Sequence, residues 1–523
     1  MKSYRSASVR WSSVVLAIAI AVLLARFEFF GVSISQAFPT KRGRVEGVIV
    51  THGTTYFVAV SGSDNGPGTA DRPWATINHA AEKAEAGDTV VVRSGRYILP
   101  AQVRPRNSGR PNAWITFNGI TGEEPILDAQ MVQRPPSAPV GLNNGAFQIE
   151  GVSYVRVAHL ALINSHDAGF TIRDSSNIDL INNSTNGTFS SGIGVWDSNH
   201  GGSATQHIRI IGNTITRATT WEFAPSDMPR QGWPPQEALS IAGAIDFEVA
   251  YNHVYSSDKE GIDIKETSKH GHVHHNSVHN MGMLGIYVDA WFGELSDVDI
   301  FSNVIHDCRS AGLALSVENG ESVKDVRIHN NLIFSNDGSG LYFSRWGVNH
   351  VRRNIQVFHN VFYHNGYGPP KADQTYYWNT GGLYLYSTSV YGVSITNNIF
   401  SDNRGFQIGY SDLYLRNSES WQTAAREHEI QISANLINGR NTVDIPIKSG
   451  GDPPDRVDIF GVNGDHAIFG NPLFKDTAGQ DFSLRRGSPA VTGHIVAGAY
   501  APGSLSELWW KRDFPPTLGS VPR

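Results

Sequence analysis

Four side chains in the middle of the chain have the types and spacing needed for proton-transfer chemistry. Asp263 and Lys265 are two residues apart in one alternating polar and apolar segment, and Tyr287 and Asp289 hold the same positions in the next. Residues two apart share one face of an extended strand. If the two segments lie side by side, these groups converge to within about 5–7 Å of one another. The pattern therefore predicts a site with an acid, a base and a phenol on one face.

Further candidate residues surround these four in the sequence. We predict that Arg345 joins the other four in catalysis, which gives the catalytic set Lys265, Asp263, Asp289, Tyr287 and Arg345. Aromatic and acidic neighbours are predicted to bind substrate: Trp291, Glu318, Trp346, Trp233 and Tyr377. Oxygen-only ligands suit Ca²⁺, and the carboxylates that would hold it are Asp263, Glu266, Asp289 and Glu237. The plain alternative is a solvated charged face whose ion pairs carry little energy.

Two reactions on a polysaccharide fit this set of residues. In β-elimination on a uronic-acid polymer, Lys265 removes the C5 proton while Arg345 or Ca²⁺ neutralises the adjacent carboxylate. A lysine base must first lose its own proton, and the neighbouring Asp263 and Asp289 oppose that loss unless a metal occupies them. Glycoside hydrolysis needs two carboxyls, about 5 Å apart for retention or about 6.5–9.5 Å for inversion. A third hypothesis is a non-catalytic carbohydrate-binding or surface-structural protein.

Asparagine recurs along the chain in a nearly constant local setting. An apolar Ile, Val or Phe follows two residues later in every case except the first, where Thr185 follows, and the intervals run from 24 to 39 residues. Such a period is typical of a solenoid, whose units bury their apolar faces only by stacking. We predict that the asparagines lie at turns and that their amides hydrogen-bond from coil to coil. They are Asn183, Asn213, Asn252, Asn276, Asn303, Asn331, Asn360, Asn398 and Asn435.

Segments of period-two alternation occur between most of these asparagines. They begin at 169, 192, 238, 261, 285, 312, 340 and 382, each with a glycine or alanine. Stacked as parallel strands, they would point their polar residues outward in columns about 4.8 Å apart. The sequence therefore predicts an all-β solenoid with the candidate site on its outside. Residues 74–86 read as a short amphipathic helix that caps the N-terminal end.

Both ends of the repeat region resemble a known group of proteins. The opening strings are YFVAVSGSD (56–64), RPWATI (72–77), AGDTV (86–90) and SGRY (94–97), and the closing strings are NPLF (471–474), DFSL (481–484) and GSPA (487–490). They resemble exported right-handed parallel β-helix proteins of the polysaccharide lyase, pectate-lyase-like group. The resemblance covers nearly all of residues 55–500 and implies a right-handed parallel β-helix. It also favours β-elimination over hydrolysis, although the fold hosts several functions.

The N-terminal residues indicate export. We predict a signal peptide or an uncleaved N-terminal anchor at 1–37, a linker at 38–55, the β-helix at 56–500 and a C-terminal tail at 501–523. We expect a periplasmic or extracellular monomer that binds a polysaccharide. Apart from a possible uncleaved N-terminal anchor, we expect no contact with the membrane. The net charge of −6 over 523 residues, with no basic block, argues against nucleic acid as a partner.

Three intervals between asparagines are too long for one coil. The inserts lie at about 219–236, 366–380 and 413–427, and each carries at least one tryptophan. Long loops on a rigid solenoid commonly form the walls of a binding site, so we expect them to flank the substrate. The single cysteine, Cys308, excludes an intramolecular disulfide and is expected to be a small buried hydrophobic residue.

Overall fold

A computed structural model describes residues 53–491, apart from 124, 134–143, 227, 370–379 and 442–458. The predicted leader, the linker up to residue 52 and the C-terminal tail therefore lie outside the described residues. So do the last residues assigned to the β-helix and Tyr377 in the second insert. Within the described part, no helix has both the length and the apolar character needed to cross a membrane.

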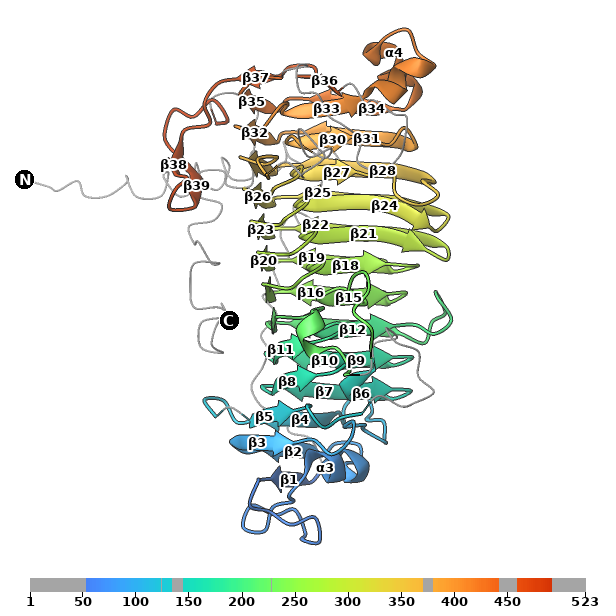
Figure 1. The fold of residues 1–523 in the computed structure, drawn as a ribbon, viewed down its shortest axis with the longest axis vertical. Helices are drawn as coiled ribbons and strands as arrows, with labels where there is room; N and C mark the ends of the chain where they lie inside the picture. The colour runs from blue at the N-terminus through green and yellow to red at the C-terminus, as the bar shows by residue number, and fades with distance from the viewer. Residues whose placement is uncertain are drawn as a thin grey trace, which may run out of the picture. The chain divides into compact units, whose positions relative to one another are not determined.

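Three parallel sheets stack along one axis and form a right-handed β-helix (Figure 1). In the described residues, sheet A consists of β1 (Thr55–Val58), β2 (Thr89–Val92), β4 (Ile115–Gly119), β7 (Ser153–Ala158), β10 (Ser176–Ile181), β13 (Gln206–Ile211), β16 (Ile245–Ala250), β19 (Lys269–His274), β22 (Glu294–Phe301), β25 (Ser322–His329), β28 (Val351–Phe358), β31 (Val390–Thr396) and β34 (Ile430–Ser433). Sheet B consists of β3 (Gly95–Ile98), β5 (Pro125–Asp128), β8 (Ala161–Ser165), β11 (Ser184–Thr188), β14 (Thr214–Thr216), β17 (His253–Tyr255), β20 (Ser277–His279), β23 (Val304–His306), β26 (Leu332–Phe334), β29 (Val361–Tyr363), β32 (Ile399–Ser401), β35 (Leu436–Asn438) and β37 (Ile468–Phe469).

Sheet C carries the alternating segments that the sequence singled out. It consists of β6 (Gly145–Glu150), β9 (Ala168–Arg173), β12 (Ile193–Trp196), β15 (Leu239–Ala242), β18 (Ile262–Lys265), β21 (Ile286–Trp291), β24 (Leu313–Asn319), β27 (Leu341–Phe343), β30 (Leu383–Leu385), β33 (Ile408–Ser411) and β36 (Ile459–Gly461), of which β36 alone runs antiparallel to its neighbour. A final hairpin joins β38 (Phe474–Asp476) to β39 (Asp481–Leu484). The predicted fold class is confirmed.

The interior of the coil is an apolar core in which equivalent residues stack. Ile262 and Ile264 of β18 stack on Ile286 and Val288 of β21, and all four are fully buried. Because side chains alternate along a strand, the residues between them point to the outside of sheet C. This confirms the predicted in and out assignment of the alternating segments.

The nine predicted asparagines form a continuous buried ladder between sheets A and B. Asn276 shows the pattern: its Nδ2 donates to Asn303 Oδ1 at 2.9 Å and to Val249 O at 2.8 Å, and its backbone N–H donates to the same Asn303 Oδ1 at 3.0 Å. The predicted stacking is confirmed, but the asparagines are not the residues that take the unusual backbone angles for which asparagine is suited. The left-handed residue of each turn is the one before the asparagine, for example Ser302 (φ 55°) or Ala434 (φ 57°). The ladder therefore compensates for strain carried by its neighbours.

A second ladder, which the sequence analysis missed, lies between sheets B and C. Asn336 Nδ2 donates to Asn365 Oδ1 at 2.9 Å, Asn365 Nδ2 to Asn403 Oδ1 at 2.9 Å, and Asn403 Nδ2 to Gln407 Oε1 at 2.9 Å. The backbone N–H of the buried Cys308 begins this ladder by donating to Asn336 Oδ1 at 3.1 Å. Two corners of the coil are thus held by side-chain amides.

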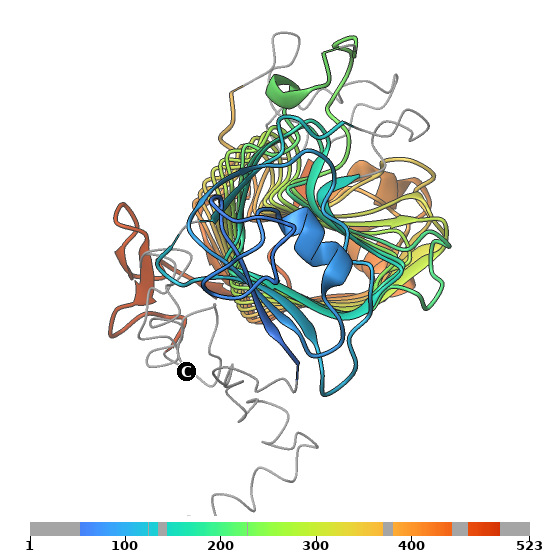
Figure 2. The ribbon, with the colours of Figure 1, turned by 90° about the horizontal axis from the view of Figure 1, so that it is seen from below.

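The N-terminal end of the coil is covered by α3 (Ile77–Lys83), which is shorter than the predicted helix at 74–86 (Figure 2). Thr76 caps the helix by accepting a hydrogen bond from the backbone of His79 at 3.1 Å. The first insert contains the 3-10 turn η2 (Trp221–Phe223), and the third folds into η3 (Asp412–Arg416) and α4 (Trp421–Glu427). The third insert packs on the last coils through stacking of Trp421 on Tyr410, so it is structural in the described chain.

Candidate functional site

The four central candidates lie on neighbouring strands of sheet C, as the sequence predicted. Asp263 of β18 is in register with Tyr287 of β21, and Lys265 is in register with Asp289. All four point away from the apolar core, yet three of them are buried: Asp263 is 2% exposed, Tyr287 5% and Asp289 3%, while the side chain of Lys265 is 14% exposed. The plain alternative of a solvated charged face is therefore excluded for these residues.

Lys265 lies between two carboxyl groups. Its Nζ is 2.7 Å from Glu237 Oε2 and 3.6 Å from Asp263 Oδ2. The two carboxyl groups are therefore close neighbours on either side of one ammonium group. Glu237 also accepts a hydrogen bond from Ser240 Oγ at 2.6 Å. Sequence reasoning had placed Glu237 in the region but had not linked it to Lys265 or Ser240.

Lys259 and Glu260 extend this network and were absent from the predicted site. Lys259 Nζ lies 3.4 Å from Glu237 Oε1 and 3.7 Å from Glu260 Oε2. The sequence did contain a signal for Glu260. Glu237 and Glu260 each stand two residues before a strand of sheet C, and those two strands are in register. We call the whole set the buried polar cluster: Glu237, Lys259, Glu260, Asp263, Lys265, Tyr287, Asp289 and Glu318.

Asp289 and Glu318 form the far side of the cluster. Asp289 Oδ1 accepts the backbone N–H of Glu318 at 3.1 Å, and its Oδ2 accepts the indole N–H of Trp291. Tyr287 donates its hydroxyl proton to Glu318 Oε1 at 2.5 Å. The predicted substrate-binding residues Trp291 and Glu318 are thus hydrogen-bonded to the catalytic candidates.

Burial and neighbouring charges shift the pKa values of these carboxyl groups in opposite directions. Burial raises the pKa of Asp263 well above its usual range, and the carboxylate of Glu237 adds to that effect. Burial and the Glu318 carboxylate do the same for the pKa of Asp289. For Glu237 the burial effect is outweighed by Lys265 and Lys259, which lower its pKa to about 2.

The two lysines are held in the charged state. Burial alone would lower the pKa of Lys265, but Glu237 and Asp263 outweigh it and raise that pKa above the usual value. The pKa of Lys259 is raised in the same way by Glu237 and Glu260. The middle of the cluster therefore holds two ammonium groups, both of them facing the ionised Glu237.

Two carboxyl oxygens of the cluster are buried and have no hydrogen-bond partner within the described residues. They are Asp263 Oδ1 and Glu260 Oε2. Most buried polar atoms in folded proteins are satisfied, so an unsatisfied one among ionisable neighbours marks a place for a ligand or a reacting group. A pair of carboxyls with divergent pKa values is a common arrangement for acid and base roles.

Arg345 and Trp346 lie farther along sheet C. Arg345 follows β27, three strands from Lys265, which corresponds to about 14 Å at the spacing of neighbouring strands. Its guanidinium lies over the ring of Tyr386, 5.4 Å from the ring centroid. Trp346 contacts Tyr287 with ring centroids 5.7 Å apart. The structure therefore brings Trp346 to the cluster but does not bring Arg345 next to Lys265.

The four carboxylates predicted to hold Ca²⁺ do not fit a shared metal site. Glu266 accepts from His200 Nδ1 at 3.1 Å beyond the end of β18, while Glu237 faces the two lysines. Asp289 is engaged by Trp291 and the Glu318 backbone. Over the described ranges, no group of three or more His, Cys, Asp or Glu side chains is placed to bind a metal ion.

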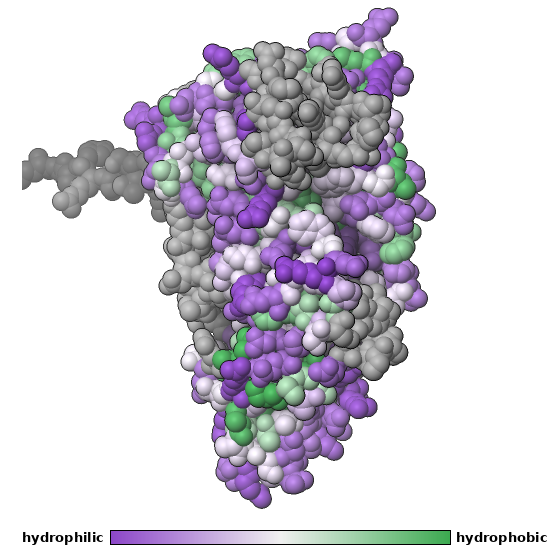
Figure 3. Space-filling model, viewed as in Figure 1, coloured by the Kyte–Doolittle hydropathy of each residue, from purple (hydrophilic) through white to green (hydrophobic). Residues whose placement is uncertain are grey.

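Hydrophilic residues dominate the visible surface over the middle coils (Figure 3). Trp233, predicted to bind substrate, is 63% exposed on the first insert rather than packed against a strand. It lines a cavity at the turns beside sheet C instead of the cluster itself.

Comparison with known protein families supports the architecture. A family model described as a right handed beta helix region matches residues 144–323 and 296–420. A second model, described as a Pel9A-like, right handed beta helix region, matches residues 56–216. The second match ends before β15, so it does not include the buried polar cluster.

Two curated relatives differ in how much of the chain they match. "Uncharacterized protein YwoF" from Bacillus subtilis is 24% identical over 505 residues, covering 84% of this chain and 92% of the relative. "Pectate lyase PEL9" from Emericella nidulans is 31% identical over 125 residues, covering 23% of this chain and 30% of the relative. Among solved structures, that of pectate lyase Pel9A is similar with a TM-score of 0.44 and 13% identity, covering 67% of this chain and 76% of that one.

Proposed function

Because the chain belongs to the right-handed β-helix family and is pectate-lyase-like, we propose that it is a carbohydrate-active enzyme that cleaves an acidic polysaccharide by β-elimination. The observation that carries the proposal is the charged Lys265 between Glu237 and Asp263 on the outer face of sheet C. The family relationship supports the substrate class, while the buried polar cluster supports the chemistry.

The geometry favours a division of roles different from the one read from the sequence. Since Glu237 keeps Lys265 protonated, Lys265 is better suited to neutralise the uronate carboxylate than to remove a proton. Asp263 is the better proton acceptor, because burial raises its pKa and a general base is most effective when its pKa is near the working pH.

The steps then balance within the cluster. The C5 proton passes to the Asp263 carboxylate, the C4–O bond breaks, and a C4=C5 double bond forms in the new non-reducing end. Tyr287, in register with Asp263 on the neighbouring strand, is the candidate to give its phenolic proton to the departing oxygen. Glu318, which accepts that proton's hydrogen bond at rest, positions the phenol. No step requires Ca²⁺.

Hydrolysis is a second candidate, supported by a different observation. Glu237 is ionised with a pKa of about 2, while burial raises that of Asp263, and the two carboxyls flank one ammonium group. A glycosidase uses one carboxyl with a raised pKa and one ionised carboxylate, placed on either side of the glycosidic bond that breaks. The two candidates differ in product, since only elimination leaves a conjugated double bond.

The experiment that tests the proposal is incubation with pectate, alginate and glycosaminoglycans, followed by ultraviolet absorbance and by reducing-end assay. Elimination predicts that both signals rise together, with or without EDTA. Reducing ends without new absorbance would establish hydrolysis instead. Neither signal on any of these polymers would contradict the enzymatic proposal.

Three substitutions test the roles. Asp263→Asn and Lys265→Met are each expected to lower kcat by about 10²–10⁴-fold, whereas Lys265→Arg keeps the charge and retains part of the activity. The matched control is Lys324→Met, which removes an exposed lysine paired with Glu294 on sheet A. If Lys265→Arg is as inactive as Lys265→Met while Asp263→Asn still turns over, Lys265 is the base.

A further inference from the structure

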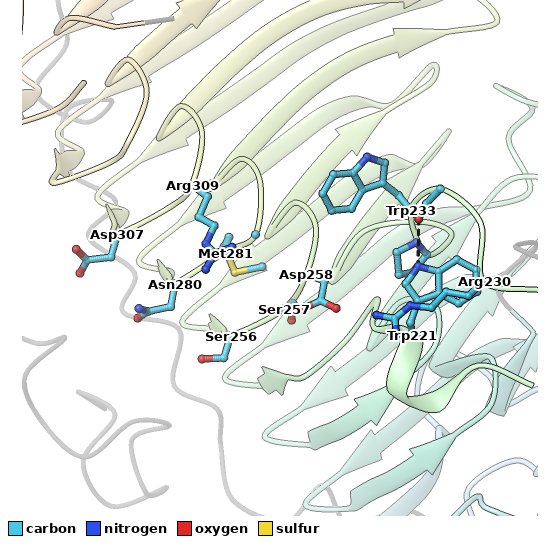
Figure 4. A pocket seen from close by; sticks show the side chains of 13 residues that line it. Trp221, Arg230, Trp233, Ser256, Ser257, Asp258, Asn280, Met281, Asp307 and Arg309 are labelled. Atoms are coloured by element: carbon cyan, nitrogen blue, oxygen red, sulfur yellow. Dashed lines mark hydrogen bonds between the residues drawn. The ribbon is translucent and has the colours of Figure 1, made fainter. Parts of the chain in front are cut away.

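A cavity of about 630 Å³ lies beside sheet C, at the turns that join sheet B to sheet C. The first insert forms one wall with Trp221, Arg230 and Trp233, and successive turns form the other (Figure 4). The residues of those turns include Asp258, Met281 and Arg309. None of these side chains belongs to the buried polar cluster.

The aromatic wall is rigidly attached and open to solvent. Trp221 Nε1 donates to Gly232 O at 3.1 Å, which ties the two ends of the insert together. Phe189 packs against Trp221 with ring centroids 5.3 Å apart, so the insert is anchored to the coil. The indole of Trp233 is 63% exposed although its neighbour Pro234 is buried. Because the loop is anchored and the ring is exposed beside the cavity, Trp233 is available to stack on a bound ligand.

The charged side chains that line the cavity are two arginines and two aspartates. Arg230 and Arg309 are both exposed, and Arg309 also acts on the nearby carboxyl of Asp337, whose pKa it lowers against the effect of burial. Of the two carboxylates, Asp307 is engaged by His306 Nδ1 at 2.6 Å and points away from the tryptophans in Figure 4. Asp258 remains to face the two arginines.

The cavity is continuous in sequence with the buried polar cluster. Asp258 is followed directly by Lys259 and Glu260, and Trp233 precedes Glu237 by four residues. Lys259 and Glu237 are in turn joined at 3.4 Å. A chain bound over sheet C would therefore pass from the cluster to the cavity within a few sugar units.

We infer that this cavity is a binding subsite for a uronate residue of the polysaccharide, with the sugar ring against Trp233, its carboxylate at Arg309 and Arg230, and its hydroxyls at Asp258. The inference rests on the proposed function for the identity of the polymer. The cavity would be a second place, apart from the buried polar cluster, at which the enzyme holds its substrate. Its distance from the cluster would fix which bond of the polymer is broken. Aromatic rings suit the apolar faces of sugars, and guanidinium groups suit carboxylates.

The test measures binding separately from turnover. Oligogalacturonate and oligoalginate are titrated into Asp263→Asn protein, followed by tryptophan fluorescence and calorimetry, with maltotetraose as the neutral probe. Trp233→Ala and Arg309→Ala, each added to that background, are expected to raise the Kd of an acidic oligomer about tenfold, equivalent to about 1.4 kcal/mol. Maltotetraose should bind weakly, and neither substitution should change its Kd.

Matched controls lie on the outer face of sheet A. Trp114→Ala removes a partly buried tryptophan that is stacked under Arg156, and Arg327→Ala removes an exposed arginine paired with Asp299. Neither should change the Kd. In the active protein, Trp233→Ala should raise KM more than it lowers kcat.

The outcomes separate the subsite from the enzyme. Cleavage with unchanged Kd and KM in Trp233→Ala and Arg309→Ala overturns the subsite and leaves the proposed function standing. Trp233-dependent binding of an oligouronate without any cleavage supports the subsite and overturns the function. Equal binding of maltotetraose, or no binding of either acidic oligomer, overturns the assignment to uronate.

Discussion

The asparagine ladder and the buried polar cluster both bury polar side chains against the same coil, but with opposite results. In the ladder, Asn303 Oδ1 accepts from Asn276, while Asn303 Nδ2 donates to Val273 O at 2.9 Å and to Asn331 Oδ1 at 3.0 Å. In the cluster, Asp263 Oδ1 is left without a hydrogen bond and three carboxyls have raised pKa values.

The difference follows from charge. A neutral amide carries both donors and an acceptor, so a column of identical amides can satisfy itself at every coil. Carboxylates accept only, and stacking them without donors is unfavourable unless cations or protons compensate. The ladder therefore stabilises the fold, while the cluster keeps reactive groups in a destabilised state. The predictions below test that distinction.

The largest effect on stability is expected from Lys265→Met. It leaves the Glu237 carboxylate buried with a weakened counter-charge, and breaking a buried ion pair from one side costs about 3–5 kcal/mol. Urea unfolding of the single variant and of Lys265→Met with Glu237→Gln measures this. The double variant should recover much of the loss because no unpaired charge remains, and a double variant as unstable as the single one would contradict the ion-pair account.

A somewhat smaller loss is expected from Asn303→Ala in the middle of the ladder. The substitution removes the side-chain donor to Val273 O and the acceptor of the Asn276 backbone N–H, at about 1–3 kcal/mol for a buried unsatisfied group. The comparison is Asn435→Ala at the end of the ladder. Asn435 accepts from the same two groups of Asn398 and donates to Ile395 O, but it donates to no further asparagine of the described residues, so one hydrogen bond fewer is lost. Equal losses at the two positions would show that the ladder does not act through its neighbours. Neither substitution should change the pH dependence of activity.

The pH dependence of stability should distinguish the cluster from the ladder by sign. Burial raises the folded-state pKa of Asp263 above its unfolded value of 3.8, so this group destabilises the fold progressively as pH rises from that value through the folded pKa. Asp263→Asn should therefore stabilise the protein at neutral pH and have little effect below the unfolded pKa. Urea midpoints measured across pH decide this, and a loss of stability at neutral pH would contradict the raised pKa.

Glu237 should behave in the opposite way. Lys265 and Lys259 lower its folded-state pKa to about 2 from 4.5, so its contribution is present above 4.5 and is lost as pH falls toward 2. The same urea titration with Glu237→Gln checks this. The variant should be destabilised at neutral pH and converge with the wild type in acid.

Much of the fold could be predicted because it repeats. The asparagines and the alternating segments recur at intervals of one coil, so a single coil observed many times determines which residues stack. The same repetition placed Asp263 beside Tyr287 and Lys265 beside Asp289, both of which are confirmed. The second ladder escaped notice because it spans fewer coils and ends in Gln407 rather than asparagine.

The details of the site could not be predicted, because they depend on side chains that reach across coils. The sequence treated Lys265 as a candidate base, and the roles of Lys259 and Ser240 were invisible until their distances to Glu237 were known. Arg345 was predicted to join the site because it follows the alternating segment that begins at residue 340, but it lies three strands from Lys265 along sheet C.

By itself the sequence determined the stacking of the coils, the face on which the polar residues stand and the register between β18 and β21, since local alternation and a repeated asparagine are enough to specify them. Only the tertiary structure decided the charge state of the site. Ionisation depends on burial and on the few ångströms between Lys265, Glu237 and Asp263, and those distances arise only when separate coils pack together.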